Sequence, residues 1–165
     1  MKKILFIILL TTFTGIVANA QSYEAMESRF KKSAPTSVDS TAFIKQGVQK
    51  AQSLFYQTDL YMRNAGNLSN QAYIADQMPD LFYVAEGDTL DLQPLREAVS
   101  KIQSSKKYKQ PKFKTSEADG YLAKLETTNT KPKLEFFLVL MKAPKRFGDE
   151  EEMVWQVFLA EPVIK

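Results

Sequence analysis

The sequence predicts an α+β fold in which helices come first and an antiparallel sheet follows. Two apolar runs near the C-terminus, residues 134–141 and 153–160, are rich in Val, Phe, Trp and Leu, a composition typical of buried strands. The residues between them, 142–150, contain Pro, Gly and many charges, so we expect a connecting loop there. Earlier in the chain the apolar residues recur at three- and four-residue spacing, which is typical of helices.

Residues 1–20 have the features of an export signal. Two lysines precede an apolar stretch, and Ala18-Asn19-Ala20 supplies the small residues that a signal peptidase recognises. Because the apolar stretch is short and ends at this site, cleavage before Gln21 fits better than a retained membrane anchor. We therefore expect a periplasmic or secreted protein with no transmembrane segment after cleavage.

The composition excludes several classes of chemistry. The chain has no Cys and no His, which excludes disulfides, ordinary zinc sites, and Ser-His-Asp or Cys-His catalysis. An acid or base would have to be Asp, Glu, Tyr or Lys with a shifted pKa. Removal of the signal takes away two lysines and no acidic residue, so the net charge falls from +3 to +1. This balance does not indicate a nucleic-acid partner, and we expect no metal and no cofactor.

The local signals for helix ends divide the first part of the domain. Asp39 is placed to cap a long helix that ends near Gly66, where glycine suits the turn that terminates a helix. Ser69 opens a shorter helix that Pro79 stops, and Asp91 is placed to cap a third. The long helix presents an apolar stripe that includes Ile44, Val48, Ala51, Phe55 and Met62.

We expect three units along the chain and about six strands. The units are the signal peptide at 1–20, a flexible polar N-terminal segment at 21–38, and a single domain at 39–165. Residues 81–84 and 89–90 indicate a small hairpin, because turn residues separate two apolar segments. The alternating segments 112–115 and 121–127 add two strands before the final pair.

The order of these elements resembles that of the NTF2-like (cystatin-like) superfamily: two helices, a short hairpin, a third helix and four antiparallel strands with the longest last. The resemblance covers residues 40–163 and includes a tryptophan in the last strand, Trp155. It implies a strongly bent antiparallel sheet that wraps around the long first helix as a cone with an open mouth. The signal and the Ala-Gln-Ser junction also look like those of exported proteins of the Bacteroidetes.

The resemblance implies little about activity, because NTF2-like domains include isomerases, dehydratases and epoxide hydrolases as well as binding and assembly modules. Our first hypothesis is a non-catalytic module of the cell envelope that binds a protein partner or a small apolar ligand in the cone. The alternative is a small-molecule isomerase or hydrolase of the ketosteroid-isomerase type that uses an Asp/Tyr pair. The aromatic residues expected to line the cone are Tyr56, Tyr61, Tyr83, Phe113, Tyr121, Phe136 and Trp155.

Two further expectations concern side chains outside the cone. Asp59 and Arg63 are four residues apart on one helix, so they indicate an ordinary surface ion pair. Trp155 lies among apolar neighbours, and we expect it to be mostly buried against the long helix near Val48, Leu54 and Phe55.

Charged side chains form two runs of opposite sign. The acidic run is residues 149–152, and the basic run comprises Lys101, Lys106, Lys107, Lys109, Lys112 and Lys114. The simplest interpretation is that the lysines protect a solvated strand edge from aggregation. The alternatives are an anionic partner, electrostatic self-association between the two runs, and a homodimer through the sheet.

Overall fold

The computed structural model of the chain describes residues 22–31, 35, 38–85 and 88–165. The predicted signal peptide lies outside these residues. The elements are α1 (Tyr23–Phe30), α2 (Ser40–Arg63), α3 (Leu68–Gln77), the 3-10 turn η2 (Pro79–Leu81), α4 (Gln93–Gln103), β1 (Phe113–Asp119), β2 (Leu122–Thr127), β3 (Leu134–Phe147) and β4 (Glu150–Ile164). The expected α+β class is confirmed.

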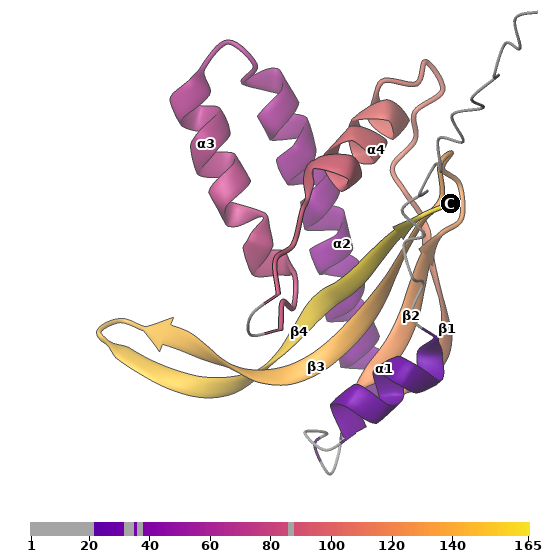
Figure 1. Cartoon of the computed structure of the whole chain (residues 1–165), viewed down its shortest axis with the longest axis vertical. Helices are drawn as coiled ribbons and strands as arrows, with labels where there is room; N and C mark the ends of the chain where they lie inside the picture. The colour runs from indigo at the N-terminus through magenta and orange to yellow at the C-terminus, as the bar shows by residue number, and fades with distance from the viewer. Residues whose placement is uncertain (1–21, 32–34, 36–37, 86–87) are drawn as a thin grey trace, which may run out of the picture.

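The four strands form one open antiparallel sheet in the order β1-β2-β3-β4, so β1 and β4 are its two edges. Side chains of α2, α4 and the α3–η2 region pack on one face of the sheet, and α1 packs on the other. Figure 1 shows β3 and β4 crossing α2 and then continuing beyond the rest of the molecule as a curved ribbon.

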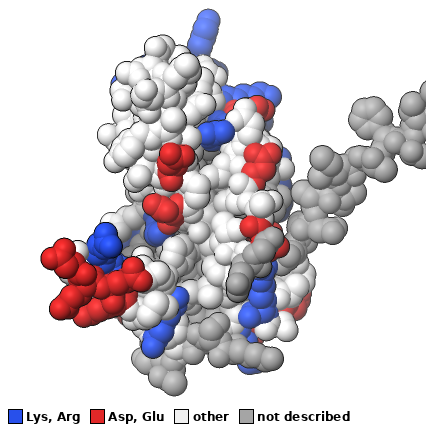
Figure 2. Space-filling model, turned by 60° about the vertical axis from the view of Figure 1, so that its left-hand side comes forward, with Lys and Arg blue, Asp and Glu red and all other residues white. Residues whose placement is uncertain are grey.

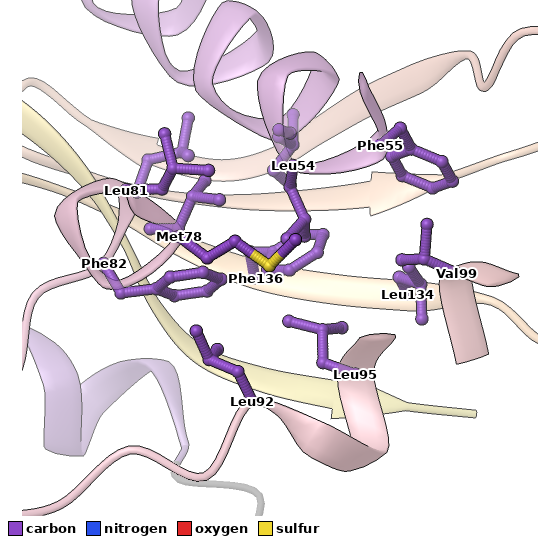
Figure 3. Close-up of a cluster of buried hydrophobic side chains, with 14 of the residues drawn as sticks. Leu54, Phe55, Met78, Leu81, Phe82, Leu92, Leu95, Val99, Leu134 and Phe136 are labelled. Carbon is purple, nitrogen blue, oxygen red and sulfur yellow. The ribbon is translucent and has the colours of Figure 1, made fainter. Parts of the chain in front are cut away.

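The main core lies between α2 and the sheet. Asp39 accepts hydrogen bonds from the backbone N–H groups of Thr41 and Ala42, which starts α2 as expected. Figure 3 shows Leu54 of α2 and Met78 after α3 meeting around Phe136 of β3.

Gly47 lets α2 approach β3 closely. A Cβ atom at Gly47 would lie 2.2 Å from Cδ1 of Leu138, far inside van der Waals contact. The glycine therefore costs some helix propensity but permits the tight helix–sheet packing of the core.

The expectation of a flexible N-terminal segment over residues 21–38 is wrong for the part that forms α1. Met26 and Phe30 are fully or almost fully buried, and they pack on Leu122, Phe137 and Val139. These sheet residues make the second face of the sheet apolar, so a cover is needed there. Two apolar residues four apart are only a weak signal for a helix. The sheet surface on which they pack is distant in sequence, so it could not strengthen that signal.

The predicted hairpin strands 81–84 and 89–90 do not pair with each other, and residues 86–87 of the predicted turn lie outside the described residues. Leu81 ends the 3-10 turn, and Phe82 makes a single parallel bridge to Leu159 of β4. The backbone N–H of Tyr83 donates to the Leu159 carbonyl at 2.7 Å, so this segment finds its partner in β4 and not in residues 89–90. The described residues therefore form four paired strands, where about six were expected.

The predicted loop over residues 142–150 is also wrong, because β3 and β4 continue through it to a two-residue turn. Gly148 in that turn has φ +65°, a conformation that glycine adopts without steric cost. The register places Lys145 opposite Glu152 and Arg146 opposite Glu151. Opposite charges that face each other across two strands favour pairing even without a core. The charged residues at this position therefore continue the hairpin and do not end the strands.

Candidate functional site

The far part of the β3–β4 hairpin, residues 141–156, is here called the arm. Pairing between β2 and β3 stops at Val139, so within the arm each strand has only the other as a partner in the described sheet. Every residue of the arm is exposed or half-buried. The arm is thus a two-stranded ribbon whose outer backbone edges lack strand partners among the described residues.

Large apolar side chains are exposed on the arm. Phe147 is 51% exposed, Met153 60% and Trp155 40%. Met153 and Trp155 are two residues apart on one strand, so they share a face of the ribbon. On that face Lys142 lies opposite Trp155, with its Nζ 5.7 Å from the centroid of the indole ring. Exposed apolar groups that lie together on a projecting element are typical of an interaction surface.

The prediction that Trp155 is mostly buried near the middle of α2 is wrong. Its ring lines a groove of about 210 Å³ beside Ala42 and Phe43, at the beginning of α2. Val157, two residues further along the strand, is 2% exposed. The cover that α2 gives to β4 therefore ends between these two positions, and Trp155 stands where the body meets the arm.

Acidic side chains are concentrated at the end of the arm. Asp149, Glu150, Glu151 and Glu152 lie at the turn, and Figure 2 shows acidic side chains gathered on a projection of the molecule. Asp149 is in the turn and Glu150 is paired with Phe147, so neither faces a basic residue across the ribbon.

The charges nearer the sheet's centre are arranged differently, because they are paired and partly covered. Glu135 is 4% exposed, and its carboxylate forms ion pairs with the Nζ of Lys165 at 2.6 Å and the Nζ of Lys124 at 3.3 Å. Glu126 lies between Lys133 at 3.1 Å and Lys114 at 3.3 Å. The hydrogen bond from Lys133, with the charge of Lys114, holds the pKa of Glu126 below its ordinary value.

A second concave region lies between α2 and the segment after α4. It has a volume of about 470 Å³, and its lining includes Tyr56, Asp59, Arg63 and Tyr108. The Arg63 Nε lies 2.8 Å from the Asp59 carboxylate, which confirms the expected ion pair. Tyr56 is 63% exposed, so this Asp and Tyr share an open cleft and not the dry pocket that an isomerase of the ketosteroid type needs.

The seven aromatic residues predicted to line one cone are distributed over both faces of the sheet. Phe136 is fully buried in the main core, and Phe113 lies edge-to-face against Phe55 with the ring centroids 6.3 Å apart. Tyr83 and Tyr121 lie on the α1 face, where Tyr83 also packs on Phe30. The others, Tyr56, Tyr61 and Trp155, belong to the α2 face. Because the sheet separates the two groups, the seven do not line a common cavity.

The sequence interpretation missed Phe147 and Met153, which the structure places on the arm. From the sequence alone, Phe147 falls in the predicted loop and Met153 in a predicted buried strand. A usable signal was the pairing of Lys145 and Arg146 with two glutamates across a Gly-Asp turn, which indicates a continued hairpin.

Within the part of the chain that the structure describes, no group of acidic side chains is arranged to hold a metal ion. In the same residues no helix combines the length and apolar character needed to cross a membrane. No protein-family model matches this chain, and neither does any curated protein or any solved structure. The function is therefore argued from the site itself.

Proposed function

We propose that this chain is an exported, non-catalytic assembly module that docks on a partner protein through its arm. The observation that carries the proposal is a long ribbon with free backbone edges and exposed Phe147, Met153 and Trp155. A protein partner fits these features better than a small ligand, because an extended ribbon offers edges and faces and no enclosed cavity.

The arm is not explained by the stability of the fold. A two-stranded hairpin is only marginally stable in water, and free strand edges favour unwanted pairing with other chains. The residues of the arm bury almost nothing in either core cluster, apart from Met141, which is partly buried. A partner that adds to an edge of the arm would supply the missing hydrogen bonds and cover the apolar side chains.

The proposal includes export and an NTF2-like relationship. Export is supported by the signal at residues 1–20 with its Ala18-Asn19-Ala20 site. The relationship is supported by the order of the elements and by an open antiparallel sheet that carries the long helix α2. Assembly modules without chemistry are among the roles that this superfamily includes.

Site-specific photo-crosslinking in the native envelope tests the proposal. A photoreactive phenylalanine analogue replaces Phe147 on the arm, and the matched control replaces Tyr73, which is 68% exposed on α3. We expect one defined cross-linked protein from position 147 and none from position 73. Equal yields from the two positions, or no product from position 147, would contradict the arm as the docking surface.

A further inference from the structure

We infer that the partner is a second copy of this chain, and that the arm of one copy pairs along the β1 edge of the next. The inference rests on the proposed function, because it gives an identity to the protein that the arm binds. Three observations carry it: the position of the two sheet edges, their charge, and their exposed apolar side chains.

The two edges of the sheet lie on opposite sides of the molecule. The strand order places β1 at one edge and β4 at the other. Figure 1 shows the arm projecting away from the side that carries β1 and the segment after α4, so an arm does not reach β1 of its own chain. A contact between unlike edges of two copies leaves one edge free on each copy, and such a head-to-tail contact continues from copy to copy.

The charges of the two edges are complementary. Lys107, Lys109 and Lys112 precede β1 and are exposed. Lysines at an edge oppose pairing with a like edge but admit an acidic one. The β4 side of the arm carries Glu150–Glu152 in addition to Asp149.

Not all of the arm's acidic charge is available. Lys145 faces Glu152 and Arg146 faces Glu151 across the ribbon, so part of their charge is compensated within the arm. Asp149 and Glu150 have no such basic partner in the register, and they are the residues nearest the turn. The acidic character is therefore greatest at the end of the arm, the part that first meets a neighbour.

Apolar side chains and dimensions also match. Tyr108, before β1, is 41% exposed, and Phe113 at the start of β1 is half-buried on the α2 face, so the two offer a surface for Met153, which lies on the corresponding face of the arm. From Met141 to Phe147 the β3 strand of the arm has seven residues and spans about 20 Å, at roughly 3.3 Å per residue, which is as long as the seven-residue β1. Such a contact is smaller than a standard stable interface, so we expect weak association that salt weakens further.

One position of β1 allows the edge to be blocked without a change of charge. The Lys112 carbonyl accepts from the backbone N–H of Thr128 on the β2 side. Since hydrogen-bonded positions alternate along an antiparallel strand, Lys114 and Ser116 face β2 and the N–H of Thr115 faces outward. Thr115→Pro therefore removes an outward donor while the ladder to β2 is kept.

Sedimentation velocity of the mature chain tests the inference. The wild type should associate with rising concentration, and about 0.5 M salt should reduce that association, since the Debye length is then only a few ångström. Thr115→Pro should sediment as a monomer, with its melting temperature showing that the variant is folded. A wild type that stays monomeric at all concentrations, or a folded Thr115→Pro that associates like the wild type, would overturn the inference.

A charge exchange provides the matched control. One variant carries D149K and E150K, the two acidic residues with no basic partner across the ribbon, and the other carries K107E, K109E and K112E. Each should be monomeric alone, and an equal mixture should associate again, because every contact in the mixture joins opposite charges. A mixture that remains monomeric contradicts the inference. The cross-linking experiment separates the two proposals: a product from position 147 with a different protein only would sustain the proposed function and refute self-assembly.

Discussion

The β3–β4 hairpin consists of two regions that share strands but differ in surroundings. In the first, here called the base, residues 134–140 pair with residues 157–164 between the helices of the two faces. In the arm the same two strands pair in continuous register for seven more residue pairs, from Met141 with Gln156 to Phe147 with Glu150, and no helix of the described residues covers them. All residues from Leu134 to Val139 are buried, whereas all from Lys145 to Met153 are exposed.

This difference shows that strand pairing and burial are separate properties. The base is held by packing, since its side chains fill both cores. The arm is held by its ladder, its turn and its cross-strand charges, which are weak contributions in water. The arm is weakly stabilised by itself and exposes apolar side chains, so contact with another surface would complete it. This difference between the arm and the base is the basis of the proposed function.

The largest expected effect compares two phenylalanines of the same strand. Phe136→Ala in the base should destabilise the fold by about 3–5 kcal/mol, because it leaves a cavity in the core. Phe147→Ala in the arm should change the free energy of unfolding by less than about 0.5 kcal/mol. Thermal unfolding of both variants measures this, and similar losses for the two would contradict the comparison.

The next effect concerns the close approach of α2 to the base. Gly47→Ala gains helix propensity of about 1 kcal/mol but forces the new methyl group into Leu138, at a cost of about 1–3 kcal/mol. We expect net destabilisation by denaturant unfolding. Adding Leu138→Val to the variant should recover part of the loss, and a Gly47→Ala protein more stable than the wild type would show that the approach is not tight.

Trp155 lies at the end of the arm next to the base, and its replacement should have an intermediate effect. Trp155→Ala should cost about 1 kcal/mol or less, because the side chain is already 40% exposed. It should, however, reduce cross-linking from the arm. A fall in melting temperature as large as that of Phe136→Ala would mean that Trp155 belongs to the core after all.

The smallest effect concerns the charge cluster around Glu126 of β2, the strand next to the base. The folded pKa of Glu126 is lowered by Lys133 and Lys114, so the stabilisation is present above the unfolded pKa and is lost as the pH falls through the folded one. Glu126→Gln should therefore be less stable than the wild type at pH 7, and the difference should shrink toward pH 3. Melting temperatures of both proteins across this range check it, and a constant difference would contradict the assignment.

Local signals in the sequence predicted much of the fold. The cap at Asp39 and the stop at Pro79 depend on neighbouring residues, and each is found as expected. The N-cap position of α4 is Leu92 and not the expected Asp91, but the Asp91 carboxylate still accepts a hydrogen bond from the N–H of Gln93, the first residue of α4. These predictions hold because helix ends are determined within one or two turns of chain.

The errors arose where a distant surface decides the outcome. Met26 and Phe30 are buried only because the sheet presents a second apolar face to α1. Trp155 is exposed although Val157 is not, because α2 begins beside one and covers the other. Where a helix begins relative to a strand in space is not encoded near that strand, so the arm and its exposed residues could not be predicted from the apolar run alone.

Amide hydrogen exchange along β3 tests the central claim most directly. In the dilute monomer, the amide protons of the base that bond within the sheet should exchange only on global unfolding. Those of the arm, from Lys142 to Phe147, should exchange by local opening at rates that are orders of magnitude faster. Protection of the arm equal to that of the base in the monomer would mean that the ribbon is stable by itself, and would contradict the claim that a partner completes it.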